Sequence, residues 1–298
     1  MVAASVWYVT CFYRFIHIEA DKLSTLQAEM HEFMTKNGVL GLVLFAEEGI
    51  NGTVAGDQPA IEKFKQYVWS LMNATDITFK DSTSEKPPFH RVRVQLRAEI
   101  VGLKRRDLVP ETTQDHHLTP KQWHDAMASS EPKLVIDTRN KYETMVGKFK
   151  GAIDPEIQNF SQWGEYLEKT EIPEGVPVYI YCTGGIRCEK AILEMRTRGH
   201  ENVYQLRDGI LGYLAEYPEG YYEGECFVFD ERVAVDHNLK PSTRFGICPG
   251  CGLTAETKNV CDRCDAEYFV CATCDPTWGP VCSKACRDLW QRHGPKKA

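Results

Sequence analysis

The sequence predicts a chain of mixed α+β and α/β class with three domains. Over residues 6–100 the hydrophobic spacing changes between strand and helix periods in a β-α-β-β-α-β order, which is ferredoxin-like. From residue 118 to beyond residue 208, buried-type strands alternate with helices, as they do around a parallel sheet. Eight of the twelve cysteines then fall between Cys248 and Cys286. We expect the domains to span residues 1–108, 109–235 and 236–298.

Length and composition are those of an ordinary globular protein. The 298 residues, 43% of them hydrophobic, are enough to bury sizeable cores. The N-terminus lacks the basic and then apolar stretch of an export signal, and no run approaches the ~18 apolar residues of a membrane helix. We therefore expect a cytoplasmic protein without a membrane span. A net charge of −7 gives no general attraction to nucleic acid, so a polyanionic partner requires a local basic patch.

The elements of the first domain each have a local pattern. Apolar residues at helical spacing, such as Leu23, Leu26 and Met30, predict a helix over 21–36, and a second helix is expected over 59–72. The Asn51-Gly52 pair predicts a hairpin turn, because this pair favours the tight turns that close hairpins. Strands are expected at 6–18, 39–45, 77–79 and 91–96, with a short strand after the turn.

A basic stripe runs along the last of these strands and beyond it. Residues 86–106 hold seven Lys or Arg against one acid, Glu99. Strand alternation places Arg91, Arg93 and Arg97 on one face. The stripe is either a solvated sheet face or a phosphate-binding surface, and in an acidic chain a stripe of one sign favours the second role about as much as the first. The candidate nucleic-acid-binding residues are Arg91, Arg93, Arg97, Lys104, Arg105 and Arg106.

The second domain begins after a polar linker at 110–117. Thr119 caps a helix whose first residue is Pro120. Strands are expected at 133–137, 178–181 and 202–206, and helices at 163–169, 187–198 and from 208. In an alternating fold of this kind, the functional site lies at the carboxyl ends of the parallel strands. Cys182 follows one such end directly.

Cys182 opens a loop whose composition predicts a reactive thiolate. The glycines of this loop let backbone N–H groups converge, the next helix adds the positive end of its dipole, and Arg187 adds a fixed charge. Cys182 is therefore the candidate catalytic nucleophile, with Arg187 as a second catalytic residue. The alternative is a buried structural cysteine, the commoner role of a free cysteine. The expected active-site loop is Cys182, Thr183, Gly184, Gly185, Ile186 and Arg187.

The C-terminal cysteines form four chelating pairs, the spacing of structural zinc sites. Two zinc ions, each held by four thiolates, would stabilise a segment too short to fold on a core of its own. Spacing alone allows consecutive pairing or a cross-brace, and disulfides are the alternative to metal. The ending from Val281 to Cys286 is similar to MYND and HIT-type fingers, which favours the cross-brace and makes His293 a substitute ligand. The predicted ligands are Cys248, Cys251, Cys261, Cys264, Cys271, Cys274, Cys282 and Cys286.

Other cysteines and histidines receive simpler interpretations. Cys188 could resolve an oxidised or persulfidated Cys182, although a buried position on the first helical turn is the preferred interpretation. Cys11 and Cys226 lie in strand patterns and are expected in the core. His116 and His117 are adjacent in a linker, where we expect solvent exposure rather than metal binding.

Several of these segments together resemble a known family. The stretches 137–143, 151–152 and 182–187 look like a rhodanese domain, whose six-residue loop begins with the nucleophilic cysteine. With 48–53 and 224–233 added, residues from about 6 to 240 resemble the rhodanese-containing tRNA uridine-34 hydroxylases. Two differences are visible. The family usually has two glycines before the isoleucine where this chain has Asp208-Gly209-Ile210, and its C-terminal cysteine region is usually simpler.

The resemblance implies an activity that the loop alone does not specify. It implies oxygen-dependent conversion of the wobble uridine of tRNA to 5-hydroxyuridine, with Cys182 essential and molecular oxygen as co-substrate. Cys182 could add to C6 of the base, or it could first be oxidised and deliver the oxygen. No flavin, haem, nucleotide or non-haem iron motif is present, which leaves oxygen activation open.

Two other functions fit the same loop. A rhodanese-type sulfurtransferase would move persulfide sulfur through Cys182 to a thiol, cyanide or tRNA. A non-catalytic scaffold would use the zinc domain to bind a protein partner, although such a scaffold has no chemical need for Cys182.

Overall fold

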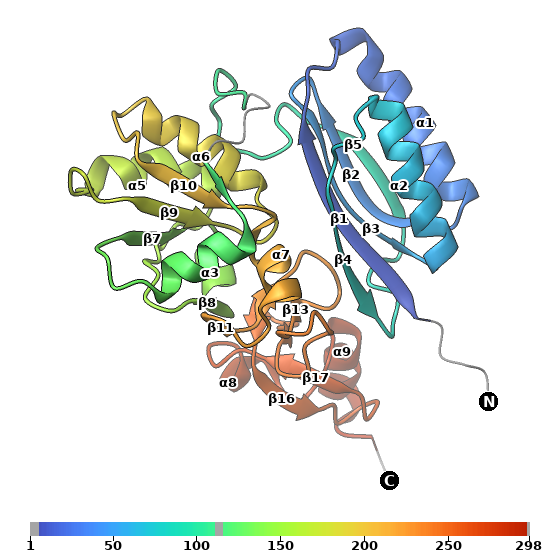
Figure 1. Ribbon diagram of the computed structural model, residues 1–298. Helices are drawn as coiled ribbons and strands as arrows, with labels where there is room; N and C mark the ends of the chain where they lie inside the picture. Colours follow the sequence, from blue (N-terminus) through green and yellow to red (C-terminus); the bar gives the residue numbers. More distant parts are fainter. Residues whose placement is uncertain (1–5, 111–115, 297–298) are drawn as a thin grey trace.

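The computed structural model describes residues 6–110 and 116–296 (Figure 1). Figure 1 shows the N-terminal sheet and its two helices on one side, the parallel sheet with its helices opposite, and the cysteine-rich part below. The expected fold class is confirmed in all three parts. None of the helices in the described ranges is long and apolar enough to span a bilayer.

The N-terminal part is a five-stranded sheet with two helices on one face, and the predicted β-α-β-β-α-β order is confirmed with one edge strand added. The strand order is β4-β1-β3-β2-β5, and β5 runs parallel to β2. The 3-10 turn at Ala20–Lys22 leads into the first helix. The elements are β1 (Trp7–Phe15), α1 (Leu23–Lys36), β2 (Leu40–Ala46), β3 (Gly49–Gly56), α2 (Gln58–Met72), β4 (Phe79–Ser84) and β5 (Val92–Leu96).

The hairpin between β2 and β3 forms, but the predicted position of its turn is wrong. The turn is Glu47-Glu48, while Asn51 and Gly52 lie within β3, opposite Leu44 and Val43. Instead of forming the turn, Gly52 leaves room for neighbouring atoms to pack closely against its backbone. A Cβ there would come 2.9 Å from a carbonyl of β2 and 3.0 Å from the Phe12 ring. The Asn-Gly pair is therefore a site of close contact, and local turn propensity gives way to tertiary packing.

The two faces of this sheet have different surroundings. The α1 and α2 face is apolar, and Phe12 of β1 meets Phe64 of α2 with ring centroids 5.5 Å apart. Because side chains alternate along a strand, Cys11 and Tyr13 of β1 and Lys80 of β4 point to the opposite face. That face lies against the central domain, since Tyr13 bonds to Glu189 there.

The central part is a parallel sheet in the order β6-β10-β9-β7, flanked by helices. The first helix has the predicted cap, in which Thr119 and Gln122 form a capping box ahead of Pro120. The elements are β6 (His117–Leu118), α3 (Pro120–Ala128), β7 (Leu134–Asp137), α4 (Lys141–Thr144), β8 (Gly147–Phe149), a 3-10 turn (Phe160–Gln162), α5 (Trp163–Lys169), β9 (Val178–Tyr181), α6 (Ile186–Arg196), β10 (Val203–Leu206), α7 (Gly209–Glu216), β11 (Tyr222–Gly224), β12 (Cys226–Phe227) and β13 (Ala234–Val235).

The expectation that His116 and His117 are solvent-exposed linker residues is wrong, since neither residue is exposed. His117 opens β6, which pairs with β10, and its side chain is only 5% exposed. A strand of two residues has too few positions to show a period, so the sequence gives no sign of it.

A buried ion cluster joins the N-terminal and central parts. Lys190 of α6 is fully buried, and its Nζ lies 2.6 Å from Glu48 and 2.7 Å from Glu99. Both carboxylates come from the N-terminal part, so the helix that follows the Cys182 loop is fixed to the neighbouring domain. Removing one partner from such a cluster costs about 3–5 kcal/mol, because the remaining charges stay buried.

The C-terminal part has little core besides its cysteines. Two short hairpins and two helices pack around Tyr268, Val270, Trp278 and Val281. The elements are β14 (Gly246–Ile247), β15 (Thr254–Ala255), β16 (Thr257–Val260), β17 (Glu267–Val270), α8 (Asp275–Trp278) and α9 (Lys284–His293).

Candidate active site and metal sites

Cys182 lies directly after β9, where the chain turns into α6, as the sequence predicts. Its side chain is fully buried, and its Sγ accepts a hydrogen bond from the Gly185 N–H at 3.1 Å. Gly185 has a φ of +101°, and a Cβ there would come 2.8 Å from the Tyr13 hydroxyl. Glycine is required at this position both by the backbone conformation and by the close approach of Tyr13.

The loop favours the thiolate form of Cys182. Burial by itself raises the pKa of this thiol. A hydrogen bond with the Cys188 thiol, the charge of Arg187 and the loop amides outweigh burial and lower the pKa to about 6. Cys188 is fully buried, which confirms the preferred interpretation of its position, and it also contacts the Thr138 hydroxyl at 3.6 Å. Cys182 is therefore largely ionised at neutral pH.

Arg187 is held in place by a carboxylate that sequence reasoning did not single out as a site residue. Its two terminal nitrogens donate to the two oxygens of Glu143, at 2.6 and 2.7 Å. Glu143 is fully buried and also accepts from the Thr183 hydroxyl at 3.4 Å. A two-bond ion pair of this kind fixes the guanidinium plane. Arg187 thus supplies a fixed positive charge next to the loop, with little freedom to move toward a ligand.

The loop is supported from behind by the start of α7. The N–H groups of Ile210 and Leu211 donate to the carbonyls of Cys182 and Thr183, at 2.9 and 3.1 Å. Gly209 has a φ of +63°, and a Cβ there would come 2.4 Å from the Cys182 carbonyl. Asp208 also has a positive φ, of 59°. Its carboxylate accepts from the Thr78 hydroxyl at 2.8 Å and so connects the loop support to the N-terminal domain.

A small cavity of about 40 Å³ lies between the loop and the N-terminal sheet. Thr183 of the loop, Lys80 and Cys11 of the sheet and Phe229 beyond β12 are among the residues that line it. Cys11 was expected in the core, but it is only half-buried and faces this cavity, whereas Cys226 is fully buried as expected.

Lys80 is the least satisfied charge at this cavity. Its side chain is 5% exposed, and its Nζ lies 3.5 Å from Asp208 and 4.7 Å from the centre of the Tyr13 ring. Within the described residues this Nζ has no hydrogen-bond partner. A buried ammonium without a hydrogen bond is costly, so the site is suited to a polar or anionic ligand group.

A larger cavity of about 500 Å³ lies on the other side of Tyr13. It is lined by Tyr13, Asp208 and Arg207 together with His117, Glu189 and other polar residues from both domains. Its volume falls in the range of small-molecule sites. The catalytic loop therefore lies at a domain boundary, with Thr183 lining the small cavity and Asp208, just ahead of the helix that supports the loop, lining the larger one.

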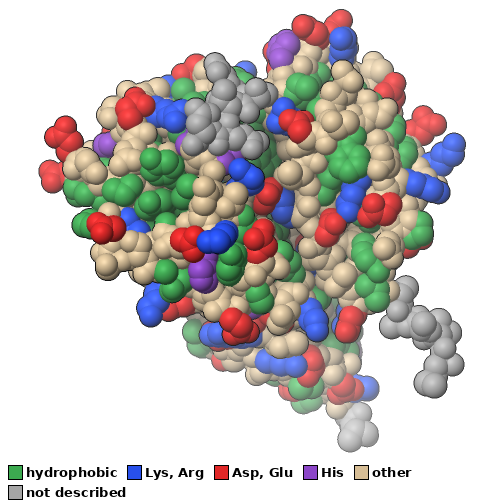
Figure 2. Space-filling model, viewed as in Figure 1, with side chains coloured by type: hydrophobic (Ala, Val, Ile, Leu, Met, Phe, Trp, Pro, Cys, Tyr) green, Lys and Arg blue, Asp and Glu red, His purple; other side chains and the backbone are tan. Residues whose placement is uncertain are grey.

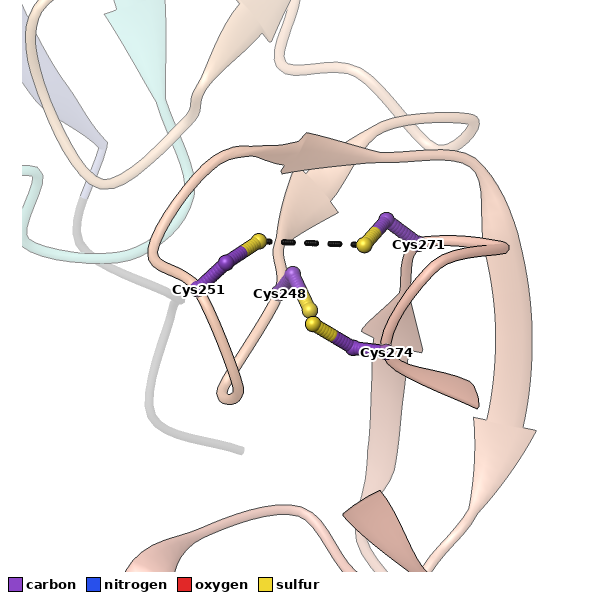
Figure 3. Close-up of side chains that lie close together, drawn as sticks. All are labelled: Cys248, Cys251, Cys271 and Cys274. Carbon is purple, nitrogen blue, oxygen red and sulfur yellow. Dashed lines mark hydrogen bonds between the residues drawn. The ribbon is translucent and has the colours of Figure 1, made fainter. Parts of the chain in front are cut away.

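The eight C-terminal cysteines form two separate groups, one of which is shown in Figure 3. In this group the Cys251 and Cys271 sulfurs are 3.7 Å apart, and in the second the Cys264 and Cys282 sulfurs are 3.5 Å apart. The first chelating pair joins the third, and the second joins the fourth, which is the cross-brace that the resemblance to MYND and HIT-type fingers favours. His293 belongs to neither group. The groups are Cys248, Cys251, Cys271 and Cys274, and Cys261, Cys264, Cys282 and Cys286.

Comparison with known proteins agrees with this architecture. Family models match an "UPF0176 acylphosphatase like domain" at residues 7–100, a "Rhodanese-like domain" at 119–216 and a "Rhodanase C-terminal" region at 223–287. A tRNA uridine(34) hydroxylase of Bdellovibrio bacteriovorus is 42% identical over 294 residues, covering 98% of this chain and 83% of the relative. This chain belongs to the tRNA uridine(34) hydroxylase family.

Further relatives in the hydroxylase family extend the same match. The Picosynechococcus protein is 38% identical over 280 residues, covering 93% of this chain and 90% of its own. The Rhizobium etli protein is 36% identical over 277 residues, covering 92% and 88%. Both are named tRNA uridine(34) hydroxylase, so the resemblance first seen in the loop and strand motifs is confirmed over most of the chain.

The part of the basic stripe around β5 lies at the edge of the N-terminal sheet of this hydroxylase-family chain, away from the catalytic loop. Arg91 and Arg93 are exposed on the face opposite Val92 and Val94, as alternation predicts. Three strands separate β5 from β4, the strand of Lys80. The face seen in Figure 2 shows acidic and basic side chains interspersed.

The other candidate cations differ in their partners. Arg97 is exposed and donates to Gln95 at 2.6 Å, and Lys104 and Arg106 are exposed. Arg105 instead pairs with Asp107 at 2.7 Å and with Glu194 at 2.5 Å. Because these two carboxylates already offset its charge, Arg105 attracts a phosphate less strongly than an exposed cation without such partners does.

Proposed function

We propose that this protein hydroxylates uridine 34 of tRNA at C5 to give 5-hydroxyuridine, with molecular oxygen as co-substrate and Cys182 as the reactive group. The match to hydroxylases, which covers 98% of this chain, carries this assignment. The loop supports it, because a fully buried thiol with a pKa of about 6 is a nucleophile at neutral pH. A tRNA substrate also agrees with the cytoplasmic location expected from the sequence.

The loop supports two routes to the product. In the first, the Cys182 thiolate adds to C6 of uracil, and the electrons of the C5–C6 double bond move onto O4. C5 then becomes electron-rich enough to attack an activated donor at the hydroperoxide level, which an external two-electron reductant forms from O2. One oxygen atom of this donor joins C5 and the other leaves as water, and loss of the C5 proton with cleavage of the S–C6 bond restores the ring and the thiolate. Lys80 would hold the charge that develops on O4. In the second, Cys182 is oxidised first and delivers the oxygen itself.

A substituted tRNA distinguishes these routes. With 5-fluorouridine at position 34, addition of Cys182 to C6 leaves a carbon at C5 that has no proton to lose, so the adduct must either accumulate as a covalent protein–tRNA complex or expel fluoride. Both outcomes should be absent with Cys182→Ser. Normal hydroxylation of ordinary tRNA with neither a complex nor fluoride from the fluorinated tRNA would rule out addition to C6.

Phe229 is placed to receive the base at the cavity mouth. Its side chain is 56% exposed, an unusual position for a large apolar residue, and the Arg187 guanidinium lies 5.8 Å from its ring centre. Enzymes that act on a base stack it on aromatic side chains after turning it out of the RNA. A cavity of about 40 Å³ is little larger than one water, so the segment around Phe229 must shift to admit a pyrimidine.

The basic stripe is proposed to hold the tRNA backbone. Replacing Arg91, Arg93 and Arg97 by Gln should weaken tRNA binding and lower the slope of its salt dependence, because fewer counterions are released. The matched control removes three exposed charges from the helical face, at Lys22, Lys36 and Lys63. Equal weakening in both triple variants would mean that net charge, and not the stripe, attracts the tRNA.

Nucleoside mass spectrometry of tRNA tests the function itself. A strain that lacks the gene should lose 5-hydroxyuridine and the nucleosides derived from it, and wild type but not Cys182→Ser should restore them. Unchanged 5-hydroxyuridine in the deletion strain would refute the hydroxylase assignment. Loss of a thiolated nucleoside instead would establish the sulfurtransferase, since a persulfide needs the same loop.

The two cysteine groups are proposed to hold one zinc ion each. Four thiolates within reach of one point match the donor set of structural zinc. Metal analysis should find two zinc per chain, and a value well below two would refute this proposal. Whether the zinc domain also binds a protein partner can be tested by comparing interacting proteins of the full chain with and without exposed-residue changes on α9.

A further inference from the structure

A third group of metal-ligand residues lies between the two larger domains, outside the cysteine-rich part. Ligand atoms of His116, His117 and Glu189 all lie within 4.8 Å of one another. Glu189 is 8% exposed and comes from α6, while His116 directly precedes β6 and His117 opens it.

Hydrogen bonds alone leave this group unsatisfied. His117 Nε2 lies 3.2 Å from Glu189 Oε2, and the Gln205 amide nitrogen contacts both His117 Nε2 and Glu189 Oε1. If Nε2 carries the imidazole proton, it can donate that proton to Glu189 Oε2, but the Gln205 amide nitrogen, itself a donor, still lies against the same ring nitrogen. If Nδ1 carries it, the proton has no acceptor, since neither His117 Nδ1 nor Gln205 Oε1 has a hydrogen-bond partner among the described residues.

We propose that His116, His117 and Glu189 bind one divalent first-row transition metal ion. Two ligand atoms 3.2 Å apart, each about 2.1 Å from one ion, enclose an angle of about 100°, which is normal for tetrahedral and octahedral sites. The ion replaces the proton on the ring nitrogen and removes the conflict with Gln205. Half a turn of the Gln205 amide brings its carbonyl oxygen toward the ion and gives this buried oxygen a partner.

The surroundings have the features of a functional metal site. Tyr13 donates to Glu189 Oε1 at 2.7 Å, which orients the carboxylate and leaves Oε2 for the ion. The cavity of about 500 Å³ is lined by Tyr13, His117, Glu189 and Gln205, so the remaining coordination positions can hold water or a small ligand. Two imidazoles and one carboxylate with open positions are the donor set of ferrous non-haem oxygenases, which makes Fe²⁺ the ion to test first.

The site is close to the catalytic loop. The Tyr13 hydroxyl that bonds to Glu189 is the same group that a Cβ on Gly185 would meet at 2.8 Å. The proposal concerns metal binding and does not require the hydroxylase assignment, so either can fail without the other.

Anaerobic equilibrium dialysis of the full-length, zinc-loaded protein against Fe²⁺ tests the proposal. Elemental analysis should find about one iron per chain in addition to the zinc of the cysteine groups. His117→Ala and Glu189→Gln should each weaken Fe²⁺ binding at least about tenfold with zinc unchanged, and Tyr13→Phe should weaken it by about 10- to 100-fold. His17→Ala is the matched control, because His17 also pairs with a glutamate but is 70% exposed.

Two results would overturn the proposal. One is an iron content of the wild type that does not exceed that of His117→Ala. The other comes from Gln205→Glu, which serves if the alanine variant does not fold, as judged by thermal melting. An added carboxylate should tighten Fe²⁺ binding at a metal site, whereas unchanged or weaker binding would mean that these residues form a hydrogen-bond network only.

Discussion

Replacing Cys188 with alanine should make the activity depend differently on pH. Burial raises the pKa of Cys182, and the Cys188 thiol is the first of the groups that lower it again, to about 6. A hydrogen bond to a charged group is worth about 1.5–3 kcal/mol, which at 1.36 kcal/mol per unit corresponds to about one to two pKa units. The pKa of Cys182 in Cys188→Ala should therefore rise to about 7–8.

The sign and size of the effect follow from the thiolate fraction. A lowered pKa means that the reactive form is present above pH 6 and lost below it. At pH 6 about half of Cys182 is ionised in the wild type, against about 1–10% in the variant, so kcat/KM should fall about 5- to 50-fold. At pH 9 both forms are ionised, and the two enzymes should be nearly equal.

The assay is kcat/KM for tRNA hydroxylation from pH 5 to 9, with product measured by nucleoside mass spectrometry. Cys226→Ala is the matched control, since Cys226 is also a fully buried cysteine of the same domain, and burial raises its pKa to about 12. A loss in Cys188→Ala that is equal at every pH would refute the reasoning, because it would indicate damage to the fold rather than to thiolate stability.

Three further predictions concern other parts of the chain. Lys190→Met leaves the Glu48 and Glu99 carboxylates buried without a cation and should cost about 3–5 kcal/mol in urea unfolding, whereas the exposed Lys121→Met should cost less than about 1 kcal/mol. Lys80→Gln should lower kcat about tenfold or more with KM for tRNA unchanged, since removal of one charge-stabilising group typically costs at least that much. Chelation of the metal should unfold residues from 246 onward, and limited proteolysis should then cut there while the first two domains stay intact.

The sequence predicts those parts of the fold and site that depend on neighbouring residues. The strand, the glycines and the helix around Cys182 all occur within about a dozen residues, so the catalytic loop can be recognised in the sequence. The zinc ligands are visible for the same reason, but their pairing is not. The second chelating pair lies in the turn between β16 and β17, and β17 separates it from the third pair, so the pairing depends on how this hairpin packs.

The parts that sequence does not predict depend on distant partners. Glu143 lies 44 residues from Arg187, and Lys80 reaches the loop from another domain. No local pattern joins such residues. A salt bridge partner of Arg187 could be sought among acids near strand ends, and Glu143 of the Tyr142-Glu143 motif was within that set, but nothing in its spacing distinguished it.

The cavity in front of the loop also determines when the enzyme becomes active during synthesis. Its wall needs Cys11 and Lys80, which leave the ribosome early, Thr183 and finally Phe229. A nascent chain that has folded its first domain and even its catalytic loop still lacks one side of this enclosure. The enclosure in front of the thiolate is thus completed only when translation has passed residue 229, so a chain that stops earlier lacks the cavity that the proposed chemistry on tRNA uses.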